Sequence, residues 1–442
     1  MRMTRALAPA VLAMVLVVPG PAGAAARPSF TDLIANLKSP VAKTREEAAV
    51  ALGKSRRREA VAPLSALIRD PEPRVRLEVV RALRELRDLS AVPALAAAIA
   101  DGDVKVREEV ISTLVELYAD RDRSGPVDRF LQLFSDEYDR SSLPPFTTVD
   151  PSVIRALATA LRDQDKGIRE EAAYAIGILD GRGAVRDLVA ALQDPEARVR
   201  AGAATAIGKV GTVEDGKALI PLLGEESTEV RNRVLQALGV LKVKDAGPAL
   251  RELYEANRRK DFAVKVLACL SRIGDPSQAD LFRQLLQDPD TDTRRLAIEG
   301  LGRILDPSLL PAFKKDYQRE RSDELRLAYS FALTLLGDHA FVDSLVLSLP
   351  SRTLGTRARN YLLEIGPGLL PELYPYLNDP EAEIRANLCD IMAELGNPEA
   401  IPKIEPLLSD PSANVADRAN RAAERLRRSA PPPSPTPPAS LR

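Results

Sequence analysis

The stretch VRDLVAALQDPEARVRAGAATAIGKVG, residues 185–211, contains the pattern that decides the fold. It predicts an apolar helix, an Asp-Pro corner, and a second helix that opens with a β-branched residue followed by arginine. Two other stretches have the same order of features: VAPLSALIRDPEPRVRLEVVRALREL at 61–86 and LLPELYPYLNDPEAEIRANLCDIMAELG at 369–396. Self-similar segments of this length indicate a repeat protein, in which each unit buries its apolar face against its neighbours.

The arginine that opens each predicted second helix sets the period of the repeat. Such arginines occupy positions 45, 76, 107, 169, 200, 231, 294, 326, 357 and 385. Most successive gaps are 31 residues, gaps of 62 and 63 span two units, and single gaps of 32 and 28 complete the series. Two helices in each period of about 31 residues predict an all-α solenoid of stacked helical hairpins.

The residues at the corner between the two helices have distinct physical roles. The aspartate suits the N-cap of the second helix, and the proline after it suits the first helical position. In six units an aspartate precedes the arginine by six residues. We expect these residues to form an internal ladder, each arginine bridging an aspartate of its own or the next repeat; the alternative is a charged stripe that binds a partner. The pairs are Asp70 and Arg76, Asp101 and Arg107, Asp163 and Arg169, Asp194 and Arg200, Asp288 and Arg294, and Asp379 and Arg385.

The full pattern, D-P-x-x-x-V-R-x-x-A-x-x-A-L/I-G, resembles the short HEAT repeats first named for phycobiliprotein lyases. The resemblance extends from Phe30 to about Arg428, in roughly twelve units. It implies a right-handed superhelix whose second helices line the concave side. Two units depart from the pattern, with Lys265 in place of arginine and Ala416 in the last unit, which fits a capping repeat.

The repeat pattern is interrupted between Tyr118 and Pro151, where the Asp-Pro corner and the Val-Arg start are missing. Residues 127–138 can form a first helix, but Pro144 and Pro145 favour a loop over 139–150. We therefore expect three repeats over 27–118, a degenerate repeat with a loop insertion over 119–150, and nine repeats over 151–428.

Aromatic residues cluster in this interruption, and aromatic residues dominate interface hot spots. We predict that the interruption contacts a partner, because long loops in compact arrays are often functional. The alternative for the first two candidates is that they fill the core where a second helix is missing. The candidate contact residues are Phe130, Phe134, Tyr138 and Phe146.

Both ends of the chain are predicted to lie outside the repeats. Residues 1–26 combine a basic start, an apolar stretch and small residues, which predicts a signal peptide cleaved near Ala24 or Ala26; the alternative is an uncleaved anchor. No later stretch is long enough to cross a bilayer, so we expect no transmembrane helix in the mature chain. Residues 429–442 are rich in proline and predict a disordered tail. The protein is therefore expected in the periplasm or outside the cell.

The composition argues against several classes of function. With 62 basic and 63 acidic residues the net charge is −1, which argues against a nucleic-acid binder. The single histidine, His339, cannot build the paired His-Glu site of HEAT-like di-iron enzymes. Residues 120–131 partly imitate a calcium loop but end in Leu131 where a bidentate glutamate belongs, which favours a solvated turn. Cys269 and Cys389 lie in apolar helical patterns and are expected in the core.

We therefore expect no cofactor, no metal and no enzymatic activity, and we predict a non-enzymatic scaffold for protein–protein interaction. The alternative is a lyase-like or other HEAT-repeat enzyme that handles a small ligand. Glutamates follow the repeated arginine in the first half of the chain only. The helix dipole alone favours an acid near a helix N-terminus, but it does not explain the loss of these acids in the second half, so a partner with a basic end and a neutral end would fit. These glutamates are Glu46, Glu47, Glu78, Glu108, Glu109, Glu170 and Glu171.

Overall fold

The structure is a computed structural model and describes residues 28–118, 147–258 and 261–428. Within these ranges the regular secondary structure is helical throughout, in paired helices, three pairs before the interruption and nine after it. The first helices are α1 Phe30–Asn36, α3 Val61–Ala66, α5 Val92–Ala98, α8 Pro151–Ala160, α10 Val185–Ala191, α12 Val213–Gly216, α14 Gly247–Asn257, α16 Ala279–Leu285, α18 Leu310–Arg319, α20 Val342–Leu347, α22 Leu370–Leu373 and α24 Ile401–Ile404.

The second helices are longer and more regular than the first. They are α2 Ala42–Lys54, α4 Pro73–Leu86, α6 Val104–Tyr118, α9 Lys166–Ile178, α11 Ala197–Val210, α13 Thr228–Leu241, α15 Asp261–Ile273, α17 Thr291–Ile304, α19 Asp323–Leu335, α21 Gly355–Ile365, α23 Ala382–Leu395 and α25 Ala413–Arg428. Consecutive second helices pack against each other along the array, as expected for an α-solenoid.

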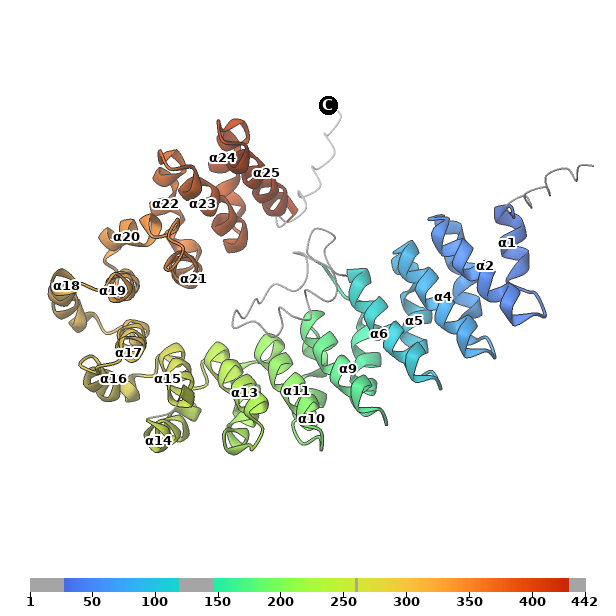
Figure 1. Ribbon diagram of the computed structural model, residues 1–442, viewed down its shortest axis with the longest axis horizontal. Helices are drawn as coiled ribbons and strands as arrows, with labels where there is room; N and C mark the ends of the chain where they lie inside the picture. Colours follow the sequence, from blue (N-terminus) through green and yellow to red (C-terminus); the bar gives the residue numbers. More distant parts are fainter. Residues whose placement is uncertain (1–27, 119–146, 259–260, 429–442) are drawn as a thin grey trace, which may run out of the picture.

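The hairpins form an open arc (Figure 1). The array runs from α1 through α13, turns through α14 to α20, and returns through α22 to α25. Around the turn the second helices α15, α17, α19 and α21 lie on the inner side of the arc, and the first helices α14, α16, α18 and α20 lie on the outer side. No helix in the described ranges is both long enough and apolar enough to span a membrane.

The corner aspartates do not occupy the N-cap that was predicted for them, but lie two residues before it. Helix α4 has Glu72 at its N-cap, and the Asp70 carboxylate accepts a hydrogen bond from the Glu72 N–H at 3.0 Å. Asp194 makes the same contact with the N–H of Glu196 at 2.9 Å. The predicted N-cap role was therefore wrong, because the aspartate forms a turn of its own that caps the residue two positions later. This turn holds the carboxylate outside the helix, facing the arginine of the preceding repeat.

The repeats on the two sides of the interruption stack directly on each other. Helix α5 packs against α8, and α6 packs against α9. Arg107 of α6 forms an ion pair with Asp163, with Nε 2.8 Å from Oδ2. The array is therefore continuous from α6 to α9. Of the predicted loop insertion, residues 119–146 lie outside the described residues.

Small residues allow the second helices to approach closely. A Cβ on Gly302 of α17 would lie 2.8 Å from the Cα of Ala332 of α19. Gly53 of α2 has the same relation to Ala82 of α4, at 2.8 Å. Glycine at this position of the repeat therefore permits backbone contact between neighbouring units.

Replacing Gly302 with alanine tests this close approach. The added methyl would meet the backbone of α19, so we expect Gly302→Ala to lower the free energy of unfolding by about 1–3 kcal/mol, measured by urea denaturation. Gly102→Ala is the control, because no atom lies within 4 Å of its added Cβ, and it should change stability by less than about 0.5 kcal/mol. Equal stability of the two variants would contradict the account.

Candidate functional site

The repeated arginines join each corner to the next. Arg76 donates from Nε and Nη2 to the two carboxylate oxygens of Asp101, at 2.6 and 2.7 Å. Its Nη1 also donates to the backbone carbonyl of Asp70, at 2.8 Å. Each such arginine therefore binds its own corner through a carbonyl and the following corner through a carboxylate. A bidentate, charge-assisted pair of this kind fixes both the spacing and the orientation of neighbouring repeats.

This ladder covers most of the first half of the array and its last step. The same bidentate contact joins Arg45 to Asp70, Arg169 to Asp194, and Arg385 to Asp410. Arg200 pairs instead with Glu225, at 3.1 and 2.9 Å, so a glutamate replaces the corner aspartate there. The arginine side chains in these pairs are only 11–16% exposed.

Ion pairing governs the charge state of the corner carboxyls. Burial acts to raise the pKa of Asp70, but the hydrogen bonds from Arg45 and from the Glu72 N–H outweigh it and hold the pKa below its usual value. The pKa of Asp194 is lowered in the same way, by Arg169 and the Glu196 N–H. The Asp70 and Asp194 carboxyls therefore remain ionised and paired at neutral pH.

The ladder is absent around the turn of the arc. Within the described ranges, the carboxylates of Asp288 and Asp379 form no ion pair with an arginine of the preceding repeat. They do cap the backbone N–H groups of Asp290 and Glu381. Arg294 and Arg385 still bind their own corner carbonyls, at 2.6 Å each.

The corner position explains two of the missing steps, those of Arg231 and Arg326. Arg258 and Arg352 stand three residues before α15 and α21, where the ladder repeats have an acid. In the turn, Arg326 donates instead to the hydroxyl of Tyr317, at 3.1 Å, and Arg231 lies over the ring of Phe262, 4.7 Å from its centroid.

The predicted partner-contact residues Phe130, Phe134, Tyr138 and Phe146 lie outside the described residues. The two described ends of this segment are joined, because the Asp150 N–H donates to the hydroxyl of Tyr118 at 3.2 Å. The described chain therefore ends and resumes at neighbouring points, Tyr118 at the end of α6 and Asp150 just before α8.

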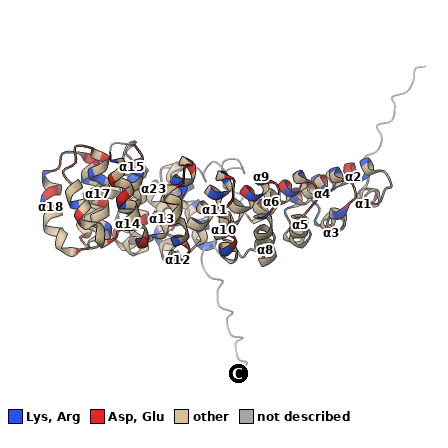
Figure 2. Ribbon diagram, turned by 90° about the horizontal axis from the view of Figure 1, so that it is seen from below, with Lys and Arg blue, Asp and Glu red and all other residues tan. Residues whose placement is uncertain are grey.

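Five of the seven glutamates of the first half fall into two groups. Glu78 and Glu109 are neutralised by Arg81, whose Nη1 lies 2.7 Å from Glu78 and whose Nε lies 3.1 Å from Glu109. Acidic and basic side chains are accordingly interspersed along α2, α4, α6 and α9 (Figure 2). A second group, Glu108 of α6 with Glu170 and Glu171 of α9, has no ion pair among the described residues. We call these three residues the acidic patch.

The acidic patch has perturbed ionisation. Burial and the charges of Glu108 and Glu170 raise the pKa of Glu171 to about 7. Burial also raises the pKa of Glu170, against the opposing charge of Arg198. Carboxylates that form no ion pair and repel each other favour a nearby cation, such as a basic side chain of a partner.

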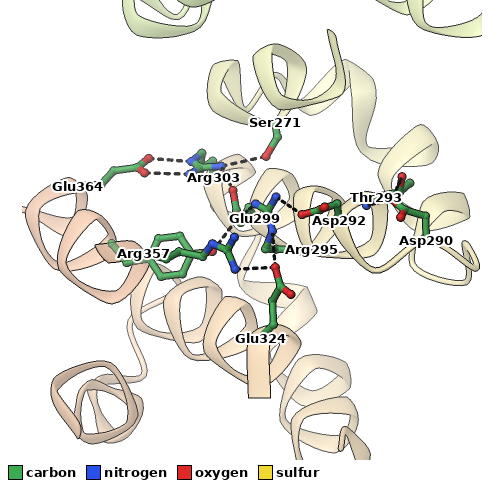
Figure 3. Close-up of polar contacts among 11 residues, drawn as sticks. Ser271, Asp290, Asp292, Thr293, Arg295, Glu299, Arg303, Glu324, Arg357 and Glu364 are labelled. Atoms are coloured by element: carbon green, nitrogen blue, oxygen red, sulfur yellow. Dashed lines mark hydrogen bonds and ion pairs between the residues drawn. The ribbon is translucent and has the colours of Figure 1, made fainter. Parts of the chain in front are cut away.

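A second polar assembly lies inside the turn and was not predicted from the sequence (Figure 3). Its centre is Glu299 of α17, which is 5% exposed. One Glu299 oxygen accepts from Arg295 at 2.7 Å and from the Tyr361 hydroxyl at 2.5 Å, and the other accepts from Arg303 at 3.2 Å. Arg303 also forms a bidentate pair with Glu364 of α21, at 2.7 and 2.9 Å. We call these five residues the bend cluster.

Within the bend cluster, the arginines offset the cost of burying the Glu299 charge. Burial acts to raise the pKa of Glu299, but Arg303 and Arg295 outweigh it, so the pKa lies below its usual value. Burial raises the pKa of the Tyr361 hydroxyl, and the charge of Glu299 raises it further. The carboxylate is therefore ionised, and the tyrosine is a neutral donor to it.

A sequence signal for half of this cluster does exist. Arg295, Glu299 and Arg303 are spaced four residues apart, which places all three on one face of α17. Their partners on α21 follow about two periods later, and the periodic pattern connects only adjacent units. The pairing across two units therefore could not be predicted from the sequence.

The family model for HEAT repeats matches residues 30–122, 154–239, 185–262 and 247–334. This chain is a HEAT-repeat protein. Among curated proteins, no sequence matches it.

Two solved structures resemble this HEAT-repeat protein in fold. The complex of CpcE and CpcF of phycocyanin lyase from Nostoc sp. PCC7120 is 20% identical, covers 74% of this chain and 100% of its own, and has a TM-score of 0.29. Importin-beta (Kap95p) from yeast is 13% identical, covers 90% of this chain and 62% of its own, and has a TM-score of 0.49. Both likenesses concern the fold alone.

Removing one ladder arginine should cost more stability than removing an exposed arginine nearby. Arg169→Ala leaves the Asp194 carboxylate and the Asp163 carbonyl short of partners, so we expect a loss of about 1–3 kcal/mol in the free energy of unfolding. The control is Arg162→Ala, whose side chain is 74% exposed and pairs with Asp187. It should cost less than about 1 kcal/mol in the same urea titration. A similar loss in both variants would rule out a special role for the ladder.

The acidic patch predicts a pH dependence with a definite sign. A carboxyl whose pKa is raised on folding favours the folded state below its unfolded pKa, and this contribution is lost as pH rises through the folded value of about 7. Glu171→Gln should therefore be more stable than the unmodified protein at about pH 8, by on the order of 1 kcal/mol after solvent screening, and no more stable at about pH 5. Glu47→Gln, at a side chain 69% exposed, should follow the unmodified protein at both pH values. Thermal melts across this range measure the difference.

Proposed function

We propose that this protein is a non-enzymatic scaffold that binds a protein partner along the inner side of its arc, and that it acts in the periplasm or outside the cell. The observation that supports this best is the extended inner side, lined around the turn by second helices from successive repeats (Figure 1). Solenoids use such surfaces to contact elongated partners.

The side chains with reactive potential support a binding role rather than a lyase-like one. Burial raises the pKa of the Cys269 and Cys389 thiols to about 12 each, so neither is poised as a nucleophile. His339 lies at a hairpin corner, with its Nδ1 2.6 Å from Glu372. In the described residues no group of His, Cys, Asp and Glu has the arrangement of a metal site.

The acidic patch supports a partner with a basic segment. Most charged side chains on the second helices are already paired, as Arg359 is with Glu394 and Arg418 with Asp390. Glu108, Glu170 and Glu171 form no ion pair among the described residues, and burial together with the charges of Glu108 and Glu170 raises the pKa of Glu171. A lysine or arginine of the partner would relieve their mutual repulsion, so the basic segment should bind beside α6 and α9.

The test is to capture the partner from the native host by chemical cross-linking, identify it, and measure its Kd with both purified proteins. We expect Glu108→Gln/Glu170→Gln/Glu171→Gln to weaken binding about tenfold or more, and added salt to weaken it as well. The control is Glu47→Gln, which should bind as the unmodified protein does. Unchanged affinity in the triple variant would refute the basic segment.

The remaining parts of the proposal have separate tests. N-terminal sequencing of the native protein should give a start at Ala25 or Arg27, and an intact Met1 would contradict export. Turnover of a small molecule by the purified protein would contradict the non-enzymatic role.

A further inference from the structure

The apolar core divides into two bodies that meet at α19. The first extends from Leu37 to Leu333, and the second extends from Leu327 to Leu426. Helix α19 contributes Leu333 to the first core and Phe331 to the second. Helix α21 packs less extensively against α19 than the preceding second helices pack against one another. The two bodies therefore share a single second helix, α19, at their joint.

The bend cluster crosses this joint. Arg303 belongs to α17 of the first body, and Glu364 belongs to α21 of the second. The two residues are 61 apart in sequence, and Glu299 and Tyr361 are 62 apart. The ladder contacts, by contrast, join residues 25 apart in adjacent repeats. In a solenoid each repeat normally contacts only its neighbours, so contacts between repeats two apart depend on the tightness of the bend.

Neighbour contacts at the joint do not depend on these links. Arg357 of α21 and Arg295 of α17 both bind Glu324 of α19, at 2.6 and 3.2 Å (Figure 3). The Tyr361 ring also stacks on Phe331 of α19, with centroids 4.2 Å apart. Opening the bend could therefore preserve the stacking of α17 on α19 and of α19 on α21, while separating α17 from α21.

From this arrangement we propose that the bend cluster is a clasp. It holds the two bodies, which form the two arms of the arc, together across the α19 joint, and it sets the width of the arc. The links of Arg303 to Glu364 and of Glu299 to Tyr361 form the closed state. When they are broken, the arms swing apart as folded bodies. This inference is independent of the proposed partner, because it rests only on contacts within the chain.

The test measures shape and folding together on the full chain. Tyr361→Phe/Glu364→Gln removes both links at α21 and keeps the aromatic stack. We expect its helical content by circular dichroism to match the unmodified protein, while the radius of gyration and maximum dimension from small-angle X-ray scattering increase. Glu394→Gln is the matched control, because it removes the ion pair from Arg359 of α21 to α23 within the second body. It should leave both dimensions unchanged.

Two results would overturn the clasp. One is a folded double variant with the dimensions of the unmodified protein. The other is loss of helix in both the double variant and the milder Tyr361→Phe, since the cluster would then support the fold of the arms rather than the angle between them.

Discussion

The array depends on one recurring interaction, the arginine that binds its own corner carbonyl and the next corner's carboxylate at once. Arg76 illustrates it, with the Asp70 carbonyl on one side and the Asp101 carboxylate on the other. A helical hairpin cannot bury its apolar face alone, so its stability comes from the contact with its neighbours. Apolar packing supplies the free energy of that contact, and the two-sided arginine fixes its register. The turn formed by the corner aspartate completes the interaction, because it directs the carboxylate toward the guanidinium of the preceding repeat.

The ladder stops over the part of the array that turns (Figure 1). Where the corner acid is replaced, as by Arg258 and Arg352, the arginine of the preceding repeat has no carboxylate to bind there. Inside the turn the bend cluster buries Glu299 among two arginines and a tyrosine. Buried charges are costly unless every one is paired, and the bend brings the partners together from repeats that a straight array would hold apart.

How much the sequence predicts depends on whether a feature repeats. The fold class and the hairpins were predictable because each recurs about every 31 residues. The same regularity placed Asp194 and Arg200 at one corner. It did not show that the aspartate lies before the N-cap, since an aspartate can accept from backbone N–H groups at either position. Nor did it show that α6 stacks on α9. Arg107 pairs with Asp163, 56 residues further along the chain, whereas a regular ladder step joins residues 25 apart. The contacts of Arg303 with Glu364 occur once, and a periodic pattern contains no information about them.

The role of the arginine is tested most directly by a double-mutant cycle on one step of the ladder. Arg76→Ala, Asp101→Ala and the double variant, compared with the unmodified protein by urea denaturation, give the coupling free energy between consecutive repeats. We expect a favourable coupling of at least about 1 kcal/mol, because the pair is bidentate and largely buried. A coupling near zero would mean that apolar packing alone holds the repeats in register, and it would contradict the central role of the arginine.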